Sequence, residues 1–185
     1  MANQHTINVV NGIDMDVLQD TVANIERDPE LGKCKFRARN RWVKGSHNRN
    51  TVSDYFCAKQ EMTHKRTFVL EADEPTMLAG QDSFANPVEQ LLCALASCVT
   101  TSMVAHAAAR GIHIEELESE VEGDIDLNGF LGLSEGTARG FTDIRIRFTC
   151  KSDSDEETLK KLAEYSPVYN TITNGARVNI EVESI

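Results

Sequence analysis

A single long helix is the sequence feature that most constrains the fold of this chain. Asn86 suits the N-cap position of a helix, and Pro87 suits the first helical position. Glu89 stands where the carboxylate of a capping box would stand. Small and apolar residues follow, and Gly111 is typical of the residue just past a helix end. The sequence therefore predicts a helix over residues 87–110 that is built to be buried.

Cys98 lies near the middle of this predicted helix. A thiol on a rigid, buried element is either an inert small hydrophobic side chain or a positioned nucleophile. Cys93 is five residues away on the same helix, so the two side chains point to different faces and cannot form a disulfide. The chain has five cysteines and no C-x-x-C pair, so we expect free thiols rather than a disulfide scaffold.

The composition indicates one soluble domain. The chain has 185 residues, 41% of them hydrophobic, and its net charge of −10 argues against a nucleic-acid partner. It has no run of about 18 apolar residues, and residues 1–6 lack the regions of a signal peptide. The histidines have no ligand spacing for zinc. We therefore expect a cytoplasmic protein with no membrane segment, no metal and no other cofactor.

The residues before the long helix change from a helical to a strand-like periodicity. Apolar residues from Met15 to Ile25 fall on one face of an amphipathic helix that ends at Asp28, and we expect residues 1–32 to form an N-terminal helical extension. From Lys33 onward, apolar and polar residues alternate. The predicted strands cover residues 33–42, 51–58 and 67–72.

Alternation resumes after the long helix. Apolar and acidic residues alternate over residues 117–127, and such acidic positions are typical of the solvated face of a sheet rather than of a metal site. A capping box over residues 154–157 starts a second helix, which ends at Ser166-Pro167. Further strands are predicted over residues 143–150 and 178–182. Strands grouped between helices favour an α+β fold with mainly antiparallel sheets.

Two motifs of the chain occur together in a known family. The first is Asn86-Pro87 with a cysteine eleven residues after the proline, Cys98, on an Ala-rich helix. The second is the pair Pro167-Val168 at the end of a helix, followed by the last strand. In this order and at this separation they resemble the OsmC/Ohr family of osmotically inducible and organic hydroperoxide resistance proteins. The resemblance covers residues 33–185, which we expect to form one OsmC-like domain.

The resemblance implies a fold, a partner and a chemistry. The fold is an intertwined homodimer in which antiparallel sheets wrap around long central helices. In the chemistry, the helix cysteine attacks the O–O bond of an organic hydroperoxide and becomes a sulfenic acid. A second cysteine condenses with it to form a disulfide, and an external thiol or dithiol then restores the enzyme. By this resemblance Cys98 is the catalytic residue.

A thiolate in the middle of a helix needs a cation from elsewhere, because the helix dipole acts only near the first turn. The resemblance implies an arginine from the N-terminal strand region, held by a glutamate at the start of the cysteine helix. The segment 45–50 matches best, so Arg49 and Glu89 are catalytic candidates, and His47 is a candidate substrate contact. The fallback candidates for the arginine are Arg37, Arg39 and Arg41.

The chain departs from the family pattern at two positions. Ser166 stands where members with peroxidase activity have the second cysteine, and a hydroxyl group cannot resolve a sulfenic acid into a disulfide. Val88 stands where the family's glutamate directly follows the proline. Glu89 comes one residue later, and it also suits the capping box of Asn86.

Two functions are therefore open. In the first, an OsmC-like thiol peroxidase uses Cys98 alone, and an external thiol reduces its sulfenic acid. In the second, a non-catalytic OsmC-like dimer binds an apolar small molecule at its interface, and Cys98 is a core residue. Ser102, one turn beyond Cys98, and Ser166 are candidate substrate contacts, whereas His106 is expected to be a hydrogen-bonded helix residue. Candidate aromatic pocket walls are Phe84, Tyr165 and Tyr169.

Overall fold

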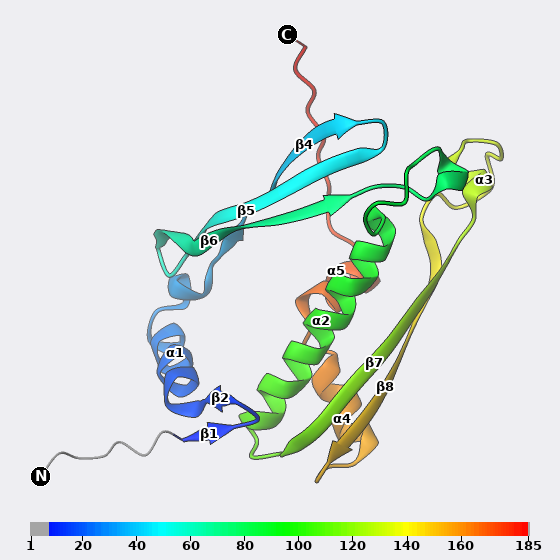
Figure 1. Ribbon diagram of the computed structural model, residues 1–185. Helices are drawn as coiled ribbons and strands as arrows, with labels where there is room; N and C mark the ends of the chain where they lie inside the picture. The colour runs from blue at the N-terminus through cyan, green and yellow to red at the C-terminus, as the bar shows by residue number, and fades with distance from the viewer. Residues whose placement is uncertain (1–7, 185) are drawn as a thin grey trace, which may run out of the picture. The chain divides into compact units, whose positions relative to one another are not determined.

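Groups of helices and strands alternate along the computed structural model, which describes residues 8–184 (Figure 1). Every pairing in the two larger sheets is antiparallel, which confirms the expected α+β class. The described chain divides into two units, one containing residues 8–9 and 14–91 and the other residues 10–13 and 92–184. The expected boundary after residue 32 lies inside the first unit and stays a prediction.

The first unit begins with an amphipathic helix. A short hairpin of β1 (Val9–Val10) and β2 (Ile13–Asp14), whose residues 10–13 belong to the second unit, precedes α1 (Met15–Arg27), and η1 (Pro29–Gly32) follows α1. The Asp14 carboxylate caps α1 by accepting hydrogen bonds from two backbone amides of its first turn. The predicted N-terminal helix is therefore confirmed.

A four-stranded sheet forms the rest of the first unit. It contains β3 (Lys35–Phe36), β4 (Arg39–Lys44), β5 (His47–Cys57) and β6 (Gln60–Ala72), and β5 pairs with the other three strands. The single strand expected over residues 33–42 is thus two strands, because the register against β5 shifts between Phe36 and Arg39. β5 begins at His47 rather than at residue 51, since the β4–β5 turn needs only Gly45 and Ser46.

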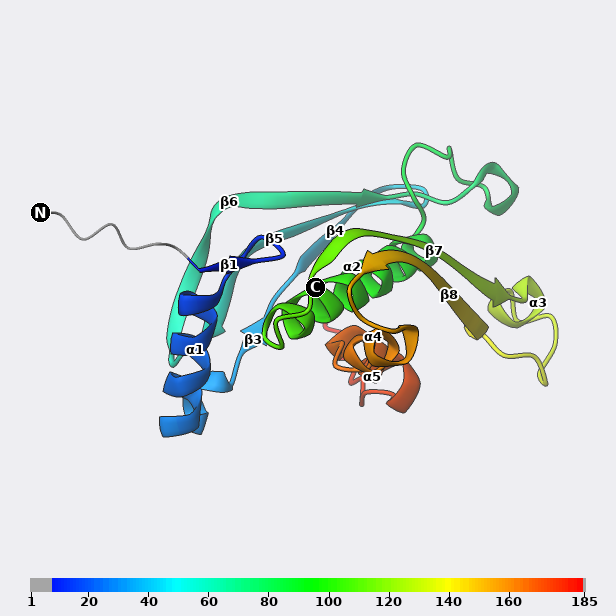
Figure 2. The same ribbon diagram turned by 90° about the horizontal axis from the view of Figure 1, so that it is seen from below.

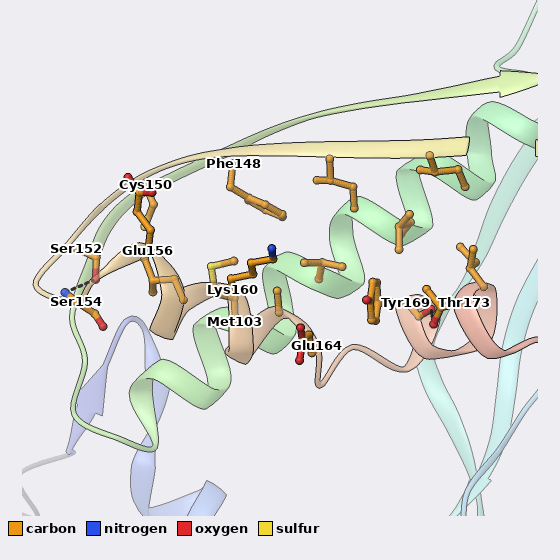
Figure 3. Close-up of a pocket in the computed structure, with 17 residues that line it drawn as sticks. Met103, Phe148, Cys150, Ser152, Ser154, Glu156, Lys160, Glu164, Tyr169 and Thr173 are labelled. Carbon is orange, nitrogen blue, oxygen red and sulfur yellow. Dashed lines mark hydrogen bonds between the residues drawn. The ribbon is translucent and has the colours of Figure 1, made fainter. Parts of the chain in front are cut away.

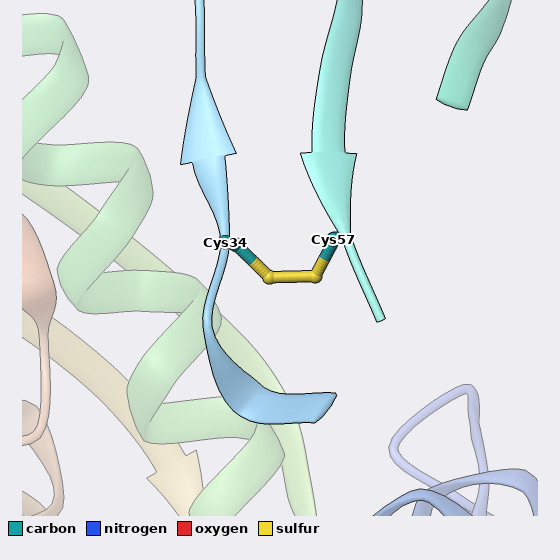
Figure 4. Close-up of a disulfide and its surroundings, with 2 residues drawn as sticks. All are labelled: Cys34 and Cys57. Atoms are coloured by element: carbon teal, nitrogen blue, oxygen red, sulfur yellow. A yellow bond between two sulfur atoms is a disulfide. The ribbon is translucent and has the colours of Figure 1, made fainter. Parts of the chain in front are cut away.

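A disulfide joins β3 to β5, so the expectation of free thiols is wrong for two of the five cysteines. Cys34 and Cys57 form this bond, while Cys93, Cys98 and Cys150 are free (Figure 4). The strand register explains the pairing: Lys35 lies opposite Phe56, so the next pair outward is Cys34 opposite Cys57. Sequence spacing alone does not show that these two positions face each other across a sheet.

The long helix α2 (Pro87–Ala108) has nearly the predicted bounds and follows η2 (Thr76–Leu78). Gly111 adopts a φ of 71°, the left-handed conformation that favours glycine just past a helix end. By length and composition α2 could cross a membrane. A stripe of its residues is buried in the second unit.

The second unit packs helices on one side of a long hairpin. The hairpin consists of β7 (Ile114–Ile125) and β8 (Phe141–Ser152), joined through the short α3 (Leu127–Phe130). Figure 2 shows α4 (Glu156–Ala163) and α5 (Pro167–Asn174) on the same side of the hairpin as α2. The buried core of this unit is Met103, Ala107, Leu159 and Leu162.

Three expectations for the C-terminal region are wrong. The N-cap of α4 is Asp155 rather than Ser154, because the Asp155 carboxylate accepts the amide hydrogen bond of Thr158. Pro167 begins α5 instead of following the last helix. Residues 175–184 form no strand, since no strand of the second unit pairs with them. Their alternating side chains are 78%, 83% and 90% exposed at Val178, Ile180 and Val182.

Candidate functional site

Cys98 lies near the middle of α2 with a free thiol and a half-buried side chain. The buried stripe of this part of the helix is Leu95, Val99 and Met103. Consecutive helix residues are rotated by about 100°, so Cys98 lies beside this stripe rather than in it. The thiol is therefore neither a fully exposed surface group nor a fully buried core group.

The two candidate serines have different surroundings. Ser102 follows Cys98 by one helical turn and is half-buried, so the two residues share a face of α2. Ser166 is completely buried and caps α5, since its hydroxyl accepts a hydrogen bond from the Tyr169 amide at 3.2 Å. Ser166 thus has a structural role at the position where a second cysteine would stand. Contact of either serine with a substrate stays a prediction.

Arg49 lies on β5, directly opposite Glu71 of β6. Its Nε donates a hydrogen bond to Oε1 of Glu71 at 2.5 Å, and its Nη2 lies 2.5 Å from the same oxygen. The Glu71 side chain is 19% exposed and the Arg49 side chain 53% exposed. The carboxylate of this ion pair is therefore mostly buried, whereas about half of the Arg49 side chain is exposed to solvent.

The fallback arginines have different partners. Arg37 donates to both oxygens of Glu61, at 2.7 and 2.8 Å, and to Asp54 at 3.3 Å. Arg39 donates to Asp54 at 2.7 Å, and this hydrogen bond is the main cause that lowers the pKa of Asp54 to about 2. Arg41 has no ion pair or side-chain hydrogen bond within residues 8–184. Arg37 and Arg39 therefore stabilise the sheet surface.

His47 lies two residues before Arg49, on the same face of β5. Its ring stacks on Phe84 with centroids 5.1 Å apart and borders a pocket of about 270 Å³. Its Nε2 lies 3.6 Å from Oε1 of Glu71 and is buried without a hydrogen-bond partner among the described residues. The structure thus brings His47 and Arg49 together at Glu71, a residue that sequence analysis does not single out.

Asp73 is a second carboxylate that sequence analysis misses. It is 2% exposed and accepts a hydrogen bond from the Ser46 hydroxyl at 2.6 Å. The amides of Glu74, Gln81 and Ser83 also donate to it, at 2.9 to 3.3 Å. These hydrogen bonds, that of Ser46 first, lower the pKa of Asp73. The carboxylate thereby ties the β4–β5 turn to the loop that leads to α2.

Glu89 takes part in the capping of α2. Its Oε2 accepts the Asn86 amide hydrogen bond at 2.8 Å, and the Asn86 side chain accepts the Glu89 amide hydrogen bond at 2.8 Å. The predicted capping box is therefore confirmed. A catalytic role of Glu89 stays a prediction, and the carboxylate that contacts Arg49 is that of Glu71.

The second unit contains a cavity of about 640 Å³ between α2, β8, α4 and α5 (Figure 3). Its apolar side chains come from all four elements, and Glu156 and Lys160 of α4 and Glu164, the residue after α4, add charged groups. Burial raises the pKa of the Cys150 thiol, which lines this cavity. Cys98 is not among the lining residues. The apolar lining includes Leu95, Val99, Met103, Phe148 and Tyr169.

His106 is a hydrogen-bonded helix histidine, as expected. Its ring stacks on Tyr165 with centroids 4.0 Å apart, and its Nδ1 lies 3.3 Å from Nη1 of Arg110. Burial, followed by the charge of Arg110, lowers the pKa of His106. Of the candidate aromatic walls, Tyr169 lines the large cavity and Phe84 the small pocket, whereas Tyr165 packs on His106.

Metal ligation has no structural support in the described part of the chain. No group of three or more His, Cys, Asp or Glu side chains there could hold a metal ion. The acidic face of β7 is partly neutralised, since Arg145 of β8 contacts Glu122 and Asp124.

Comparison with known proteins gives a family match over the central and C-terminal residues. The OsmC-like protein family model matches residues 80–181, which include Cys98 and Ser166. A comparison with curated proteins finds no match.

Two solved structures with TM-scores above 0.5 share this fold at low sequence identity. An OsmC like protein from Mycoplasma pneumoniae has a TM-score of 0.56 and 19% identity, over 76% of this chain and 89% of that chain. A Psychrobacter arcticus protein, provisionally described as osmotic stress induced and a detoxification response protein, has a TM-score of 0.53 and 16% identity, over 72% and 85%. The organic hydroperoxide resistance protein OhrB of Bacillus subtilis has a TM-score of 0.43 and 19% identity, over 76% and 92%.

Proposed function

This chain belongs to the OsmC-like protein family, and from this premise we propose that it reduces organic hydroperoxides with the thiol of Cys98. The observation that carries the proposal is the setting of Cys98. It is a free, half-buried thiol on a well-capped helix, eleven residues after Pro87. A nucleophile on a rigid element is held in one orientation toward an incoming substrate.

The proposed reaction has two stages. The Cys98 thiolate attacks one oxygen of the O–O bond, which breaks to give a cysteine sulfenic acid and an alkoxide that takes up a proton to become an alcohol. An external thiol then attacks the sulfenic sulfur, releasing water and forming a mixed disulfide. A second external thiol, or the second thiol of a dithiol, releases Cys98 as a thiol.

An external reductant is required because the buried hydroxyl of Ser166 cannot form a disulfide. We assign Arg49 to stabilise the thiolate and the developing alkoxide, because a guanidinium group is a strong donor to anions. His47, Ser102 and Ser166 remain proposed substrate contacts, and Glu89 a proposed catalytic group. The proposed location is the cytoplasm.

We propose that the working form is a homodimer. Val178, Ile180 and Val182 alternate as in a strand but are largely exposed in the single chain. On the four-stranded sheet of the first unit, the side chains of Phe36 and Trp42 are 75% and 68% exposed. Apolar surface of this kind is typical of an interface that another subunit covers.

Stopped-flow mixing with cumene hydroperoxide tests the proposal. The Cys98→Ser variant is expected to lose hydroperoxide consumption, because serine is not a nucleophile toward the O–O bond at neutral pH. Cys93→Ser is the matched control on the same helix and should react like the wild type. A Cys98→Ser variant that consumes cumene hydroperoxide at the wild-type rate would refute the proposal.

One observation favours a second function, the binding of an apolar small molecule by a non-catalytic dimer. It is the 640 Å³ cavity of the second unit, which is large enough for a small ligand and is lined by apolar side chains. Titration with a fluorescent fatty-acid probe tests this function. The Met103→Trp variant, which places a bulky ring in the cavity, should abolish binding, and unchanged binding would exclude the cavity.

A further inference from the structure

We propose that the disulfide between Cys34 and Cys57 is a reversible thiol–disulfide exchange site, which dithiols reduce and which controls the attachment of the N-terminal arm. The N-terminal arm is the segment of α1 and η1, residues 15–32. In the oxidised form the bond fastens this arm to the four-stranded sheet, and in the reduced form the arm is released. All of these residues belong to the first unit, and the exchange does not involve Cys98.

The disulfide is open to attack from solvent. Cys34 is exposed and Cys57 is half-buried. The bond lies at the outer end of the β3–β5 pairing, one position beyond Lys35 and Phe56, rather than in the middle of the sheet (Figure 4). Exposed disulfides are more readily reduced than structural ones and are typically regulatory or catalytic. The proposed cytoplasmic location favours the same assignment, because cytosolic disulfides are usually transient.

The noncovalent contacts at this end of the N-terminal arm are weak. β3, which follows the arm, pairs with β5 at two positions only within the described ladder. Within α1, all of which the structure describes, Met15 alone is buried. An ion pair between Asp28 and Lys59 joins the arm to the β5–β6 turn, but these side chains are 41% and 50% exposed, and such surface pairs stabilise little. The covalent bond is therefore the main fastening.

The turn that follows Cys57 depends on the same fastening. Ala58 and Lys59 connect β5 to β6 with φ values of 48° and 62°. This left-handed conformation favours glycine or asparagine, so other residues adopt it only where flanking contacts hold the turn. Those contacts include the disulfide of Cys57 and the ion pair of Lys59 with Asp28. Opening of the disulfide therefore loosens the turn and, with it, the ion pair to the arm.

The exchange reaction is balanced by the dithiol alone. One thiolate of the dithiol attacks Sγ of the exposed Cys34, the S–S bond breaks, and Cys57 leaves as a thiolate that takes up a proton. The second thiol of the dithiol then attacks its own sulfur in the mixed disulfide, which releases Cys34 as a thiol. The dithiol loses two electrons and two protons, and the protein gains them. A low-molecular-weight disulfide such as oxidised glutathione reverses the reaction by accepting both.

Alkylation mapped by mass spectrometry tests whether the bond is reversible in the folded, full-length protein. Incubation with dithiothreitol without denaturant, followed by acid quenching and alkylation in denaturant, should add alkyl groups at Cys34 and Cys57. Removal of dithiothreitol and treatment with oxidised glutathione should link these two cysteines to each other again. A bond that dithiothreitol opens only in denaturant, or that does not form again, would overturn the inference.

Hydrogen–deuterium exchange tests the release of the N-terminal arm. In the reduced wild type, the amides of residues 15–32 should exchange about tenfold faster or more than in the oxidised form, because local opening no longer works against the bond. The control is β7 and β8 of the second unit, whose protection in the first minutes of labelling should not change. Equal exchange of the arm in both forms overturns the inference. Faster exchange of β7 and β8 does so too, since the bond would then be a general stabiliser.

Two variants complete the test. Cys34→Ser/Cys57→Ser should fold and show fast exchange of the arm with and without dithiothreitol, and slow exchange or a failure to fold would overturn the inference. Cys98→Ser is the matched control, and its arm should respond to dithiothreitol like that of the wild type. Loss of this response would contradict an exchange site that is independent of Cys98. Wild-type hydroperoxide consumption by Cys98→Ser, in contrast, refutes only the proposed function.

Discussion

At the scale of single residues, two carboxylates at the end of β6 have different roles. Glu71 is partly open to solvent and contacts Arg49 and, more distantly, His47. Asp73, two residues further along the chain, is buried and accepts four hydrogen bonds. The first carboxylate pairs with Arg49, and the second ties the β4–β5 turn to the loop that leads to α2.

Replacement of Asp73 should destabilise the fold. Asp73→Ala leaves several buried donors without an acceptor, which costs about 1–3 kcal/mol. Urea unfolding at neutral pH should therefore show a lower free energy of unfolding than the wild type. Asp20→Ala, at an exposed position of α1, is the control and should change little. Equal free energies for Asp73→Ala and the wild type would contradict the assigned role.

The same residue predicts a pH dependence. The pKa of Asp73 is lowered by folding from its ordinary value of 3.8. Its ionised form therefore stabilises the protein above about pH 4, and this stabilisation is lost as the pH falls toward the folded-state pKa. The difference between the wild type and Asp73→Ala should shrink in urea titrations below that pH. A difference that stays constant would show that ionisation of Asp73 does not contribute.

At the scale of elements, the sequence predicts those features that depend on residues close together in the chain. The start of α2 depends on Asn86, Pro87 and Glu89, which interact with one another within one turn, so its cap could be predicted. The alternation of β7 and β8 likewise reports a sheet with one solvated face.

The cross-strand partner of Arg49, in contrast, could not be predicted from the sequence. The β5–β6 pairing begins with Cys57 opposite Gln60, and extension of this register would place Phe68 opposite Arg49. The register instead shifts between Val52 and Asp54, which brings Glu71 opposite Arg49. A bulge of this kind depends on the whole sheet and has no local sequence signal. The available signal was only a carboxylate near the end of a predicted strand.

The disulfide between β3 and β5 should contribute to stability. It closes a loop with a sequence separation of 23, for which chain entropy predicts about 3 kcal/mol. Cys34→Ala/Cys57→Ala should lower the free energy of unfolding by about that amount in urea titrations. Wild-type protein treated with dithiothreitol should behave like the double variant.

A thiol count is the direct check of this element. Protein denatured without a reductant should show three free thiols, those of Cys93, Cys98 and Cys150. Five alkylated cysteines in protein that is denatured and alkylated without a reductant would contradict the disulfide.

At the scale of the whole molecule, the single chain leaves strand-like apolar residues exposed at its C-terminal segment. A strand needs the edge of another strand, and residues 178–182 pair with none in the described chain, so their alternation predicts a strand that the single chain does not form. We expect this segment to become ordered against a second copy of the chain.

Sedimentation velocity checks the assembly. The wild type should sediment as a species of twice the chain mass of 20.5 kDa. Replacement of Val178, Ile180 and Val182 by serine should shift it toward the monomer, because apolar contact area is lost. Leu133→Ser, an exposed residue between β7 and β8, is the control. A wild-type monomer at micromolar concentration would contradict the homodimer.

The identity of the oxidised sulfur tests the central claim most directly. Protein mixed with one equivalent of cumene hydroperoxide in the presence of dimedone, then digested and analysed by mass spectrometry, should carry the dimedone adduct on Cys98, together with stoichiometric cumyl alcohol. Consumption of the hydroperoxide with the adduct on Cys93 or Cys150, or with no adduct on Cys98, would contradict the assignment of Cys98 as the reacting thiol.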